Sequence, residues 1–122
     1  MELNQYMVVL VNLDPTIGSE IKKTRPCVIV SPDEMNKFLK TIVVVPMTTN
    51  LKPYPTRVPV QTNEKKAMLV IDQIRTIDKQ RIHKAFGSLT PSEIQKCKAV
   101  LKETFVDWVV NRESWIVNRE RN

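Results

Sequence analysis

The sequence predicts a small α+β domain: a mostly antiparallel barrel or curled sheet with one short helix and one C-terminal helix. Three observations predict this class. The chain has 122 residues, 42% of them hydrophobic, so it can bury one core and has no room for a second domain. Two segments open with helix-capping signals. Finally, apolar and β-branched runs alternate with turns, at residues 7 to 13, 26 to 30, 41 to 46, 56 to 60, 67 to 72 and 82 to 89.

The strand predictions depend on composition and on the residues that end each run. Val8 to Val11 is typical of a buried strand, which Asp14-Pro15 stops. The run from Thr56 to Val60 alternates polar and apolar residues, but Pro59 cannot donate to a ladder, so we expect an edge strand there. Between two later strands, Thr76 to Lys79 is predicted to begin a single helical turn.

Both helices are predicted from their first residues. Ser31-Pro32-Asp33-Glu34 and Thr90-Pro91-Ser92-Glu93 each put a hydroxyl at the N-cap, Pro at the first helical position and Glu two residues further on, as in a capping box. The first helix is short. The second carries apolar residues at three- and four-residue intervals, which predicts one stripe packed on the sheet: Ile94, Cys97, Leu101, Phe105 and Trp108.

Positive charge is concentrated in the middle of the chain. Residues 22 to 84 hold 13 Lys and Arg against 5 Asp and Glu, a net charge of +8, whereas the rest of the chain has a net charge of −2. This uneven distribution favours a polyanionic partner such as nucleic acid over a general effect on solubility.

The cysteine content excludes several kinds of site. Cys27 and Cys97 are predicted to be buried thiols in a reducing compartment, since two cysteines are too few for a disulfide framework. A single histidine leaves no ligand set for zinc, and we expect neither a metal nor another cofactor.

The N-terminus has no signal-peptide pattern and no apolar run long enough to span a membrane, which predicts a cytoplasmic protein.

Three motifs occur in order along the chain. The first is Leu13-Asp14-Pro15-Thr16-Ile17-Gly18-Ser19-Glu20, which Arg25-Pro26 follows after four more residues. The others are Pro46-Met47-Thr48-Thr49 and Asp72-Gln73-Ile74-Arg75-Thr76-Ile77-Asp78. Together they resemble the L-D-P-T-x-G-S-E with R-P, P-x-T-T and D-Q-x-R-T-I/L-D elements of the MazF/PemK family of toxin endoribonucleases, also called mRNA interferases.

This resemblance implies a PemK/CcdB-like toxin fold and the role of toxin in a toxin–antitoxin system. The implied activity is sequence-specific cleavage of single-stranded mRNA without metal, which leaves 2′,3′-cyclic phosphate and 5′-hydroxyl ends. The implied partners are single-stranded RNA, a second copy in a homodimer, and a cognate acidic antitoxin that wraps the basic surface. No membrane partner is expected.

The resemblance places the family's catalytic Arg at Arg25 and its catalytic Thr at Thr48. Arg25 is suited to a bidentate contact with the scissile phosphate, and the Thr48 hydroxyl can donate to a non-bridging oxygen. A guanidinium has a pKa above about 12 and is a poor base. We therefore expect the base to be Glu20 or a water held by the loop. His83, the single histidine, is predicted on the surface of a strand, and it excludes a two-histidine mechanism within one subunit.

Substrate contacts are expected from residues near the same motifs. Ser19, Thr49 and Lys52 are candidates for holding phosphates, and the amide of Gln73 could read a base edge. Tyr54 is the best candidate for stacking on a base, although a Tyr flanked by prolines could equally belong to a rigid loop that packs on the sheet.

Two positions depart from the family pattern. Tyr6-Met7 stands where the family commonly has Gly-Asp or Gly-Glu, so any role for an acidic residue there is lost. Val70 stands where some plasmid-borne relatives have an Arg, which concentrates the predicted catalysis on Arg25. Because the family domain usually ends near residues 105 to 109, we expect a domain over residues 1–109 and a helical extension or tail over residues 110–122.

Two other functions stay open on the sequence. A gyrase poison resembling CcdB would share the architecture and carry a tryptophan near the C-terminus, as Trp108 and Trp115 are here, but such toxins lack the R-P and P-x-T-T pair. A catalytically silent RNA-binding barrel is the other alternative.

Overall fold

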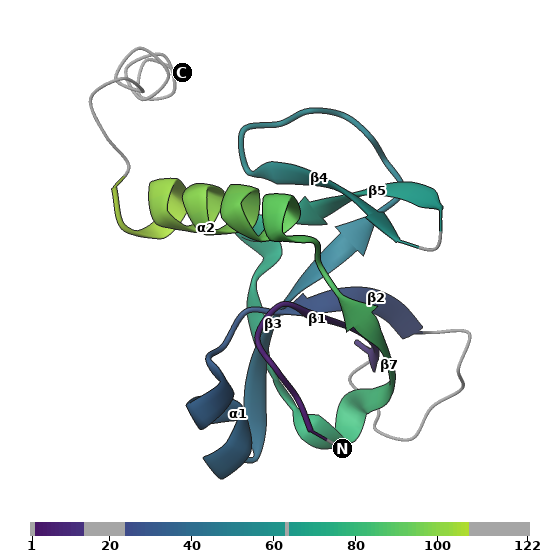
Figure 1. The fold of residues 1–122 in the computed structure, drawn as a ribbon, viewed down its shortest axis with the longest axis vertical. Coiled ribbons are helices and arrows are strands. Elements are labelled where there is room, and N and C mark those ends of the chain that lie inside the picture. Colours follow the sequence, from purple (N-terminus) through teal and green to yellow (C-terminus); the bar gives the residue numbers. More distant parts are fainter. Residues whose placement is uncertain (1, 14–23, 63, 108–122) are drawn as a thin grey trace.

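The computed structural model describes residues 2–13, 24–62 and 64–107. These residues form seven β-strands, two α-helices and two 3₁₀ turns (Figure 1). In chain order they are β1 (Met7–Asn12), β2 (Thr24–Ile29), α1 (Asp33–Phe38), β3 (Thr41–Thr48), β4 (Arg57–Thr62), β5 (Lys65–Val70), η2 (Ile71–Gln73), β6 (Arg75–Asp78), η3 (Lys79–Arg81), β7 (Ile82–Ser88) and α2 (Pro91–Phe105). The predicted α+β class is confirmed.

The sheet curls around β3. One edge of β3 pairs with β2, and its other edge is divided between β6, which pairs with residues 41 to 44, and β5, which pairs with Met47 and Thr48. The other strands extend this arrangement in the order β4-β5-β3-β2-β1-β7, and the pairs are antiparallel. Figure 1 shows the β4–β5 hairpin beside α2 in the upper part of the view, with β1, β2 and β7 below them. The strand that contains Pro59, β4, is an edge strand as predicted.

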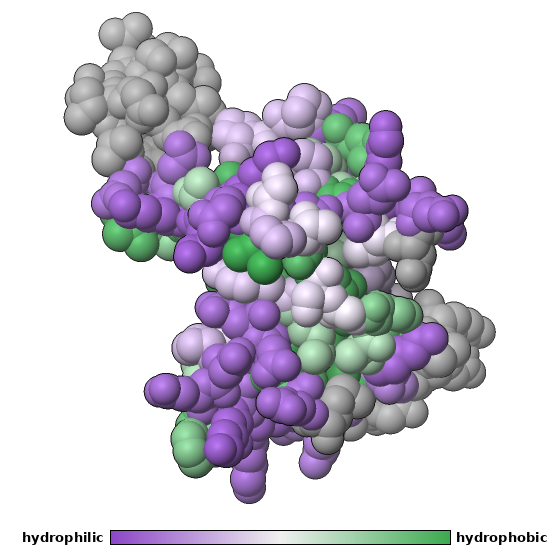
Figure 2. Space-filling model, viewed as in Figure 1, coloured by the Kyte–Doolittle hydropathy of each residue, from purple (hydrophilic) through white to green (hydrophobic). Residues whose placement is uncertain are grey.

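Both faces of the central strands are buried. Val8 and Val28 belong to one hydrophobic cluster, whereas their chain neighbours Val9 and Cys27 belong to a second. Burial on both faces explains why these runs are continuously apolar instead of alternating. On the face drawn in Figure 2, hydrophobic side chains show as a band below α2, and hydrophilic residues cover most of the remainder.

The predicted capping box opens α2 and fastens the helix to the sheet. Thr90 Oγ1 accepts a hydrogen bond from the backbone N–H of Glu93 at 3.2 Å, and Glu93 Oε1 accepts from the N–H of Thr90 at 2.9 Å. The other carboxylate oxygen, Oε2, accepts from the N–H of Gln61 in β4 at 2.7 Å. Glu93 therefore satisfies one donor at the start of the helix and another on the edge strand.

Glu93→Ala is expected to lower the free energy of unfolding by about 1–2 kcal/mol, because the backbone N–H groups of Thr90 and Gln61 both lose their acceptor. Urea denaturation of the two proteins measures this difference. Gln95→Ala is the control, since Gln95 is an exposed residue of the same helix. Equal losses in both variants would contradict the fastening role of Glu93.

The predicted apolar stripe of α2 is confirmed only in part. Cys97 is buried, and Ile94 and Leu101 pack against the first cluster. Phe105 is 54% exposed, so its predicted packing was wrong. The reason is visible in Figure 1, where the C-terminal end of α2 projects past the β4–β5 hairpin. Trp108 lies outside the described residues, among which no helix is long and apolar enough to cross a membrane.

The predicted capping box of the first helix was wrong. α1 begins at Asp33, its N-cap residue is Pro32, and no side chain caps it. Ser31 is buried instead: its Oγ donates to Asn36 Oδ1 and accepts from the N–H of Val43 at 3.0 Å. Ser31 thus makes a hydrogen bond to β3 in place of a local cap, because the part-buried N–H of Val43 needs an acceptor.

The predicted helical turn at Thr76 was also wrong, because Thr76 belongs to β6. Residues 75 to 78 pair with residues 41 to 44 of β3, and the 3₁₀ turn follows at Lys79–Arg81. A further 3₁₀ turn, Ile71–Gln73, takes the place of the last residues of the predicted strand 67 to 72. Pairing with β3, more than thirty residues away, decided the conformation of β6, and the residues around Thr76 alone do not reveal that pairing.

Tyr6 occupies a backbone conformation that favours glycine. Its φ is 69°, in the left-handed region, and it stands where the family resembled by the motifs commonly has Gly. The backbone N–H of Tyr6 donates to Ile29 O at 2.6 Å, and its carbonyl accepts from the N–H of Leu89 at 2.9 Å. These two bonds to the ends of β2 and β7 explain why the conformation is kept when a larger residue is present.

Both cysteines are buried free thiols, as predicted. Burial raises the pKa of Cys27 to about 12, while the guanidinium groups of Arg25 and Arg75 lower it by a smaller amount. Burial also raises the pKa of Cys97 to about 11. The protonated thiols are therefore favoured in the folded state.

Alkylation of these thiols by iodoacetamide at pH 8 is expected to be at least about 100-fold slower in the native protein than in urea, because little thiolate forms. Folded pKa values above the ordinary value of 9.0 also predict that the thiols' contribution to stability is complete below pH 9 and is lost as pH rises toward 12. Equal alkylation rates with and without urea would contradict this burial.

Candidate functional site

The register of the sheet brings Arg25 and Thr48 together. β2 pairs with β3 through Cys27 opposite Pro46, and continuing this register by two residues places Arg25 opposite Thr48. The guanidinium confirms the proximity, since Arg25 Nη2 donates to the carbonyl of Met47 at 2.9 Å. Two of the three predicted catalytic residues therefore lie at one end of two adjacent strands. The third, Glu20, lies outside the described residues.

These two residues share a cleft of about 390 Å³, which we call the Arg25 cleft. Three cations, three hydroxyls and no carboxylate are among its described lining residues. They are Arg25, Pro26, Met47, Thr48, Thr49, Thr62, Lys65, Lys66 and Ala67. Cations and hydroxyl donors without a competing carboxylate are suited to binding a phosphate.

The loop that follows β3 orients the Thr48 hydroxyl through a hydrogen bond. Its oxygen accepts a hydrogen bond from the backbone N–H of Asn50 at 3.2 Å. Because this bond uses a lone pair, the hydroxyl hydrogen stays available to donate to an oxygen in the cleft. Among the described residues, no three His, Cys, Asp or Glu side chains gather in a way that could hold a metal ion.

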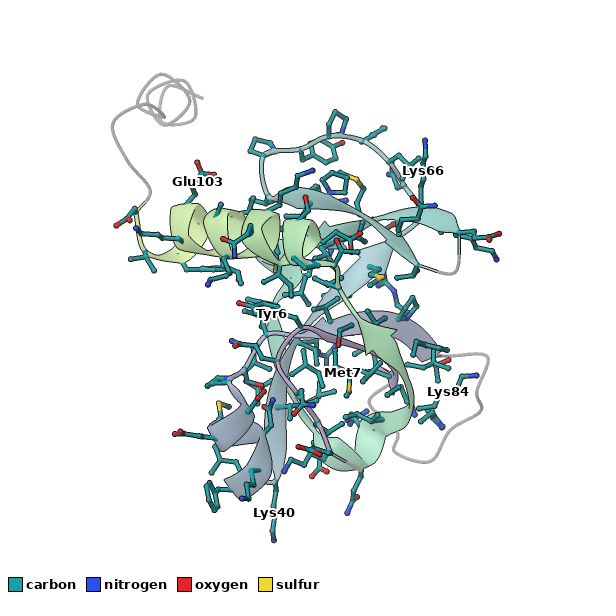
Figure 3. All side chains as sticks on the ribbon, in the orientation of Figure 1. Tyr6, Met7, Lys40, Lys66, Lys84 and Glu103 are labelled. Carbon is teal, nitrogen blue, oxygen red and sulfur yellow. The ribbon has the colours of Figure 1, made fainter. Side chains whose placement is uncertain are left out.

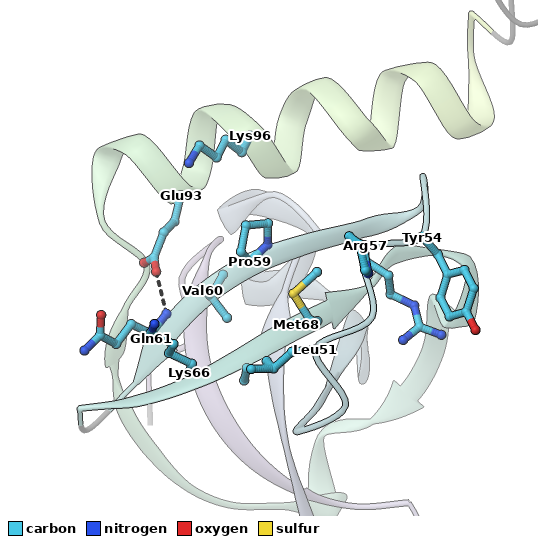
Figure 4. A pocket seen from close by; sticks show the side chains of 12 residues that line it. Leu51, Tyr54, Arg57, Pro59, Val60, Gln61, Lys66, Met68, Glu93 and Lys96 are labelled. Atoms are coloured by element: carbon cyan, nitrogen blue, oxygen red, sulfur yellow. Dashed lines mark hydrogen bonds between the residues drawn. The ribbon is translucent and has the colours of Figure 1, made fainter.

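A second and larger hollow lies beside the Arg25 cleft. This Tyr54 hollow has a volume of about 640 Å³ and is drawn in Figure 4. Its lining is Leu51, Pro53, Tyr54, Arg57, Pro59, Val60, Gln61, Lys66, Ala67, Met68, Glu93 and Lys96. The floor is largely apolar, Arg57, Lys66 and Lys96 supply positive charge, and the Glu93 carboxylate is occupied by backbone N–H groups.

Lys66 and Ala67 line both hollows, so the two form a continuous surface. Figure 3 shows Lys66 on the β4–β5 hairpin, far from Lys40 near α1 and from Lys84 on β7. Hence the lysines and arginines of residues 22 to 84 do not form one surface patch. Those of the hairpin adjoin the Arg25 cleft, and others lie elsewhere on the sheet.

The predicted substrate contacts separate into three groups. Thr49 lines the Arg25 cleft and Tyr54 lines the Tyr54 hollow. Lys52 lies in the loop between them but lines neither, and Gln73, exposed in η2, is not brought to either hollow. Ser19 lies outside the described residues. His83 is exposed on β7, as predicted.

Sequence reasoning missed the residues that the β4–β5 hairpin contributes. Thr62, Lys65 and Lys66 line the Arg25 cleft because β5 pairs with the end of β3, where Thr48 is opposite Met68. The signal that could have located them is the Lys pair directly before an apolar strand. Its position near Arg25 depends on strand pairing, which a single sequence does not specify.

A comparison with known protein families shows to which family the chain belongs. A family model described as "PemK-like, MazF-like toxin of type II toxin-antitoxin system" matches residues 4–105. The chain belongs to this family. The match spans the described elements from β1 to α2, including both hollows, so the resemblance predicted from the three motifs is confirmed.

Individual proteins of this toxin family are similar over most of the chain. Endoribonuclease MazF of Staphylococcus epidermidis is 33% identical over 93 residues, which cover 71% of this chain and 78% of that protein. Endoribonuclease toxin MazF of Escherichia coli strain K12 is 34% identical over 93 residues, covering 75% and 84% respectively.

Solved structures confirm the predicted curled-sheet toxin fold, and MazF toxins are among the matching structures. A mycobacterial endoribonuclease in complex with its cognate antitoxin has a TM-score of 0.73 at 22% identity, covering 87% of this chain and 98% of its own. A MazE–MazF structure from Deinococcus radiodurans has a TM-score of 0.72 at 16% identity, covering 87% and 97%. At these identities the similarity concerns the fold alone.

Proposed function

We propose that this MazF-like protein is the toxin of a type II toxin–antitoxin system and a sequence-specific endoribonuclease of single-stranded mRNA. Cleavage uses the RNA's own 2′-hydroxyl, needs no metal, and leaves 2′,3′-cyclic phosphate and 5′-hydroxyl ends. The observation that carries this proposal is the Arg25 cleft, where a guanidinium, two lysines and the Thr48 hydroxyl adjoin one another without a carboxylate among the described lining residues.

The cleft supports a division of roles around the scissile phosphate. Arg25 stabilises the negative charge of the phosphorane and donates a hydrogen bond to the departing 5′-oxygen, Thr48 donates one to a non-bridging oxygen, and water supplies the proton that completes the 5′-hydroxyl. The base that takes the 2′-hydroxyl proton is Glu20 or a water held by its loop, because a guanidinium with a pKa above about 12 rarely loses its proton. Glu20 and its loop lie outside the described residues.

The RNA strand continues from the Arg25 cleft past Lys66 into the Tyr54 hollow. Lys65 and Lys66 hold phosphates, and Thr49 donates to the backbone of the same strand. One base stacks on the ring of Tyr54, a residue that is 49% exposed. Nucleotides farther from the cleft are contacted by Ser19, Lys52 and Gln73.

The proposed partners follow from the same basic surface. An acidic antitoxin neutralises the toxin by covering it, as antitoxin complexes are known for two proteins of similar fold. The toxin acts as a homodimer in the cytoplasm. Residues 1–109 form its nuclease domain, and residues 110–122 are an extension to which we assign no function.

The test is incubation of the purified protein with a long single-stranded RNA in EDTA, followed by mapping of the cut sites and the end chemistry. Cuts at a short recurrent motif with cyclic phosphate and 5′-hydroxyl ends are expected. The same assay with Glu20→Gln, at several pH values and a single turnover, identifies the base: an unchanged rate and pH profile assigns that role to water. Absence of cleavage by the folded wild-type protein would overturn the proposed function.

A further inference from the structure

We propose that Asp72 is a positioning residue that holds the loop between β3 and β4, so that Tyr54 and Arg57 form a platform for one base of the RNA. This inference rests on the proposed function, because it names how one nucleotide beside the cleaved bond is held. Asp72 itself lines neither the Arg25 cleft nor the Tyr54 hollow, and it therefore acts through other residues.

Asp72 contacts Thr56, the last residue before β4, and Arg57, the first residue of β4. Its Oδ1 accepts a hydrogen bond from Thr56 Oγ1 at 2.7 Å and lies 4.0 Å from Nε of Arg57. The Arg57 side chain is only 16% exposed, and its Nε is buried with no hydrogen-bond partner in the described part of the chain. The carboxylate of Asp72 thus compensates a largely buried guanidinium and fixes a hydroxyl with the same oxygen.

Arg57 in turn supports the ring of Tyr54. Its guanidinium carbon lies 5.2 Å from the ring centroid, within cation–π contact, and Figure 4 shows the two side chains together at one end of the hollow. The backbone N–H of Arg57 also donates to the carbonyl of Tyr54 at 2.9 Å, which closes a turn around Pro55. Tyr54 is a half-exposed residue, and an accessible aromatic ring with a guanidinium against it is suited to stacking on a base.

The rest of the loop connects this platform to the Arg25 cleft through successive hydrogen bonds. They run from the N–H of Asn50 to Thr48 Oγ1 at 3.2 Å, from the N–H of Lys52 to Asn50 Oδ1 at 3.1 Å, and from the N–H of Tyr54 to Lys52 O at 3.0 Å. The loop is thus anchored by Thr48 at one end and by Asp72 at the other. Pro53 and Pro55 stiffen its interior, and Asp72 sets how it lies against the sheet.

The negative charge of Asp72 distinguishes a positioning role from the alternative, in which the carboxylate only repels the RNA. A carboxylate that merely lies near a polyanion repels it, so removing such a group should tighten RNA binding. A positioning carboxylate has the opposite effect, because its removal releases Arg57 and Tyr54 from the orientation that stacks the base. The sign of the change in KM therefore decides between the two.

The first experiment compares Asp72→Ala with the wild type on an RNA that contains the mapped cleavage motif. We expect KM to rise by about five- to tenfold with kcat little changed, since the loss of an orienting hydrogen bond affects binding in the ground and transition states alike. Thr56→Val should raise KM similarly. Asp72→Asn keeps an acceptor for Thr56 and should recover part of the loss. Glu34→Ala, which removes an exposed carboxylate of α1, is the matched charge control and should leave KM unchanged.

The second experiment repeats Asp72→Ala in a Tyr54→Ala background. If Asp72 acts through the platform, the second substitution adds no further rise in KM. An additive rise, or a KM in Asp72→Ala equal to or below that of the wild type, would overturn the inference. Thermal unfolding of each variant identifies any that fails to fold, and Asp72→Asn and Thr56→Val then carry the test. Lack of cleavage by the wild type refutes the proposed function instead, so the two failures are distinct.

Discussion

Replacing Arg25 with alanine is expected to slow RNA cleavage by about 100- to 1,000-fold under single-turnover conditions, the usual cost of removing one preorganised donor from a developing oxyanion. The expectation follows from the Arg25 cleft, where Arg25 lies beside Thr48. The lysines of the cleft still attract RNA, so affinity should fall much less than rate. Quench-flow cleavage and filter binding of the same RNA measure the two quantities separately.

The controls separate chemistry from folding. Arg25 is exposed, and loss of its hydrogen bond to the carbonyl of Met47 should lower the free energy of unfolding by about 1 kcal/mol or less. Arg25→Lys keeps the charge but loses the planar fork, so an intermediate rate is expected. Lys98→Ala removes an exposed cation of α2 and should cleave normally. An Arg25→Ala protein that cuts at wild-type speed would place catalysis outside the Arg25 cleft.

Leu69→Ala is expected to lower the free energy of unfolding by about 3 kcal/mol, within the range found for truncating a buried leucine. Leu69 has no exposed surface and lies in the first hydrophobic cluster, on β5 between Met47 of β3 and Val58 of β4. Since small domains have about 5–15 kcal/mol of stability, this loss is a large fraction of the total. Urea denaturation followed by circular dichroism measures it.

Leu51→Ala is the matched control because Leu51 is 50% exposed, and its loss should be well under half as large. Leu69 also lies opposite Met47, whose carbonyl accepts the hydrogen bond of Arg25. Cleavage by Leu69→Ala should therefore fall before global unfolding is detected. Equal destabilisation by the two leucine variants would contradict the central place of Leu69 in the core.

Local features of this protein were predictable from its sequence. The capping box of α2 involves Thr90 and Glu93, three residues apart, and the structure contains it as predicted. The apolar runs of the central strands were also recognisable, because burial on both faces leaves no polar residue between them. The motif around Arg25 and that around Thr48 indicated the family, which the family match confirmed.

Features that depend on distant parts of the chain were not predictable. The sequence around Ser31 is typical of a helix cap, but the Ser31 hydroxyl instead accepts a hydrogen bond from the part-buried N–H of Val43 in β3. Thr76 was predicted to start a helical turn, yet β3 pairs with it. The sequence identified Asp72 only as part of a motif. Its contact with Thr56, sixteen residues earlier in the chain, is visible only in the structure.

The difference between the predictable and the unpredictable features has a physical cause. Caps and apolar periodicity arise from interactions within one or two turns of the chain, so the types of neighbouring residues suffice to predict them. The Arg25 cleft combines residues from β2, from the end of β3 and from the β4–β5 hairpin, which meet only through strand pairing and register. Since one residue of slippage would reverse every side chain on a strand, the full lining of this cleft exists only in the folded sheet.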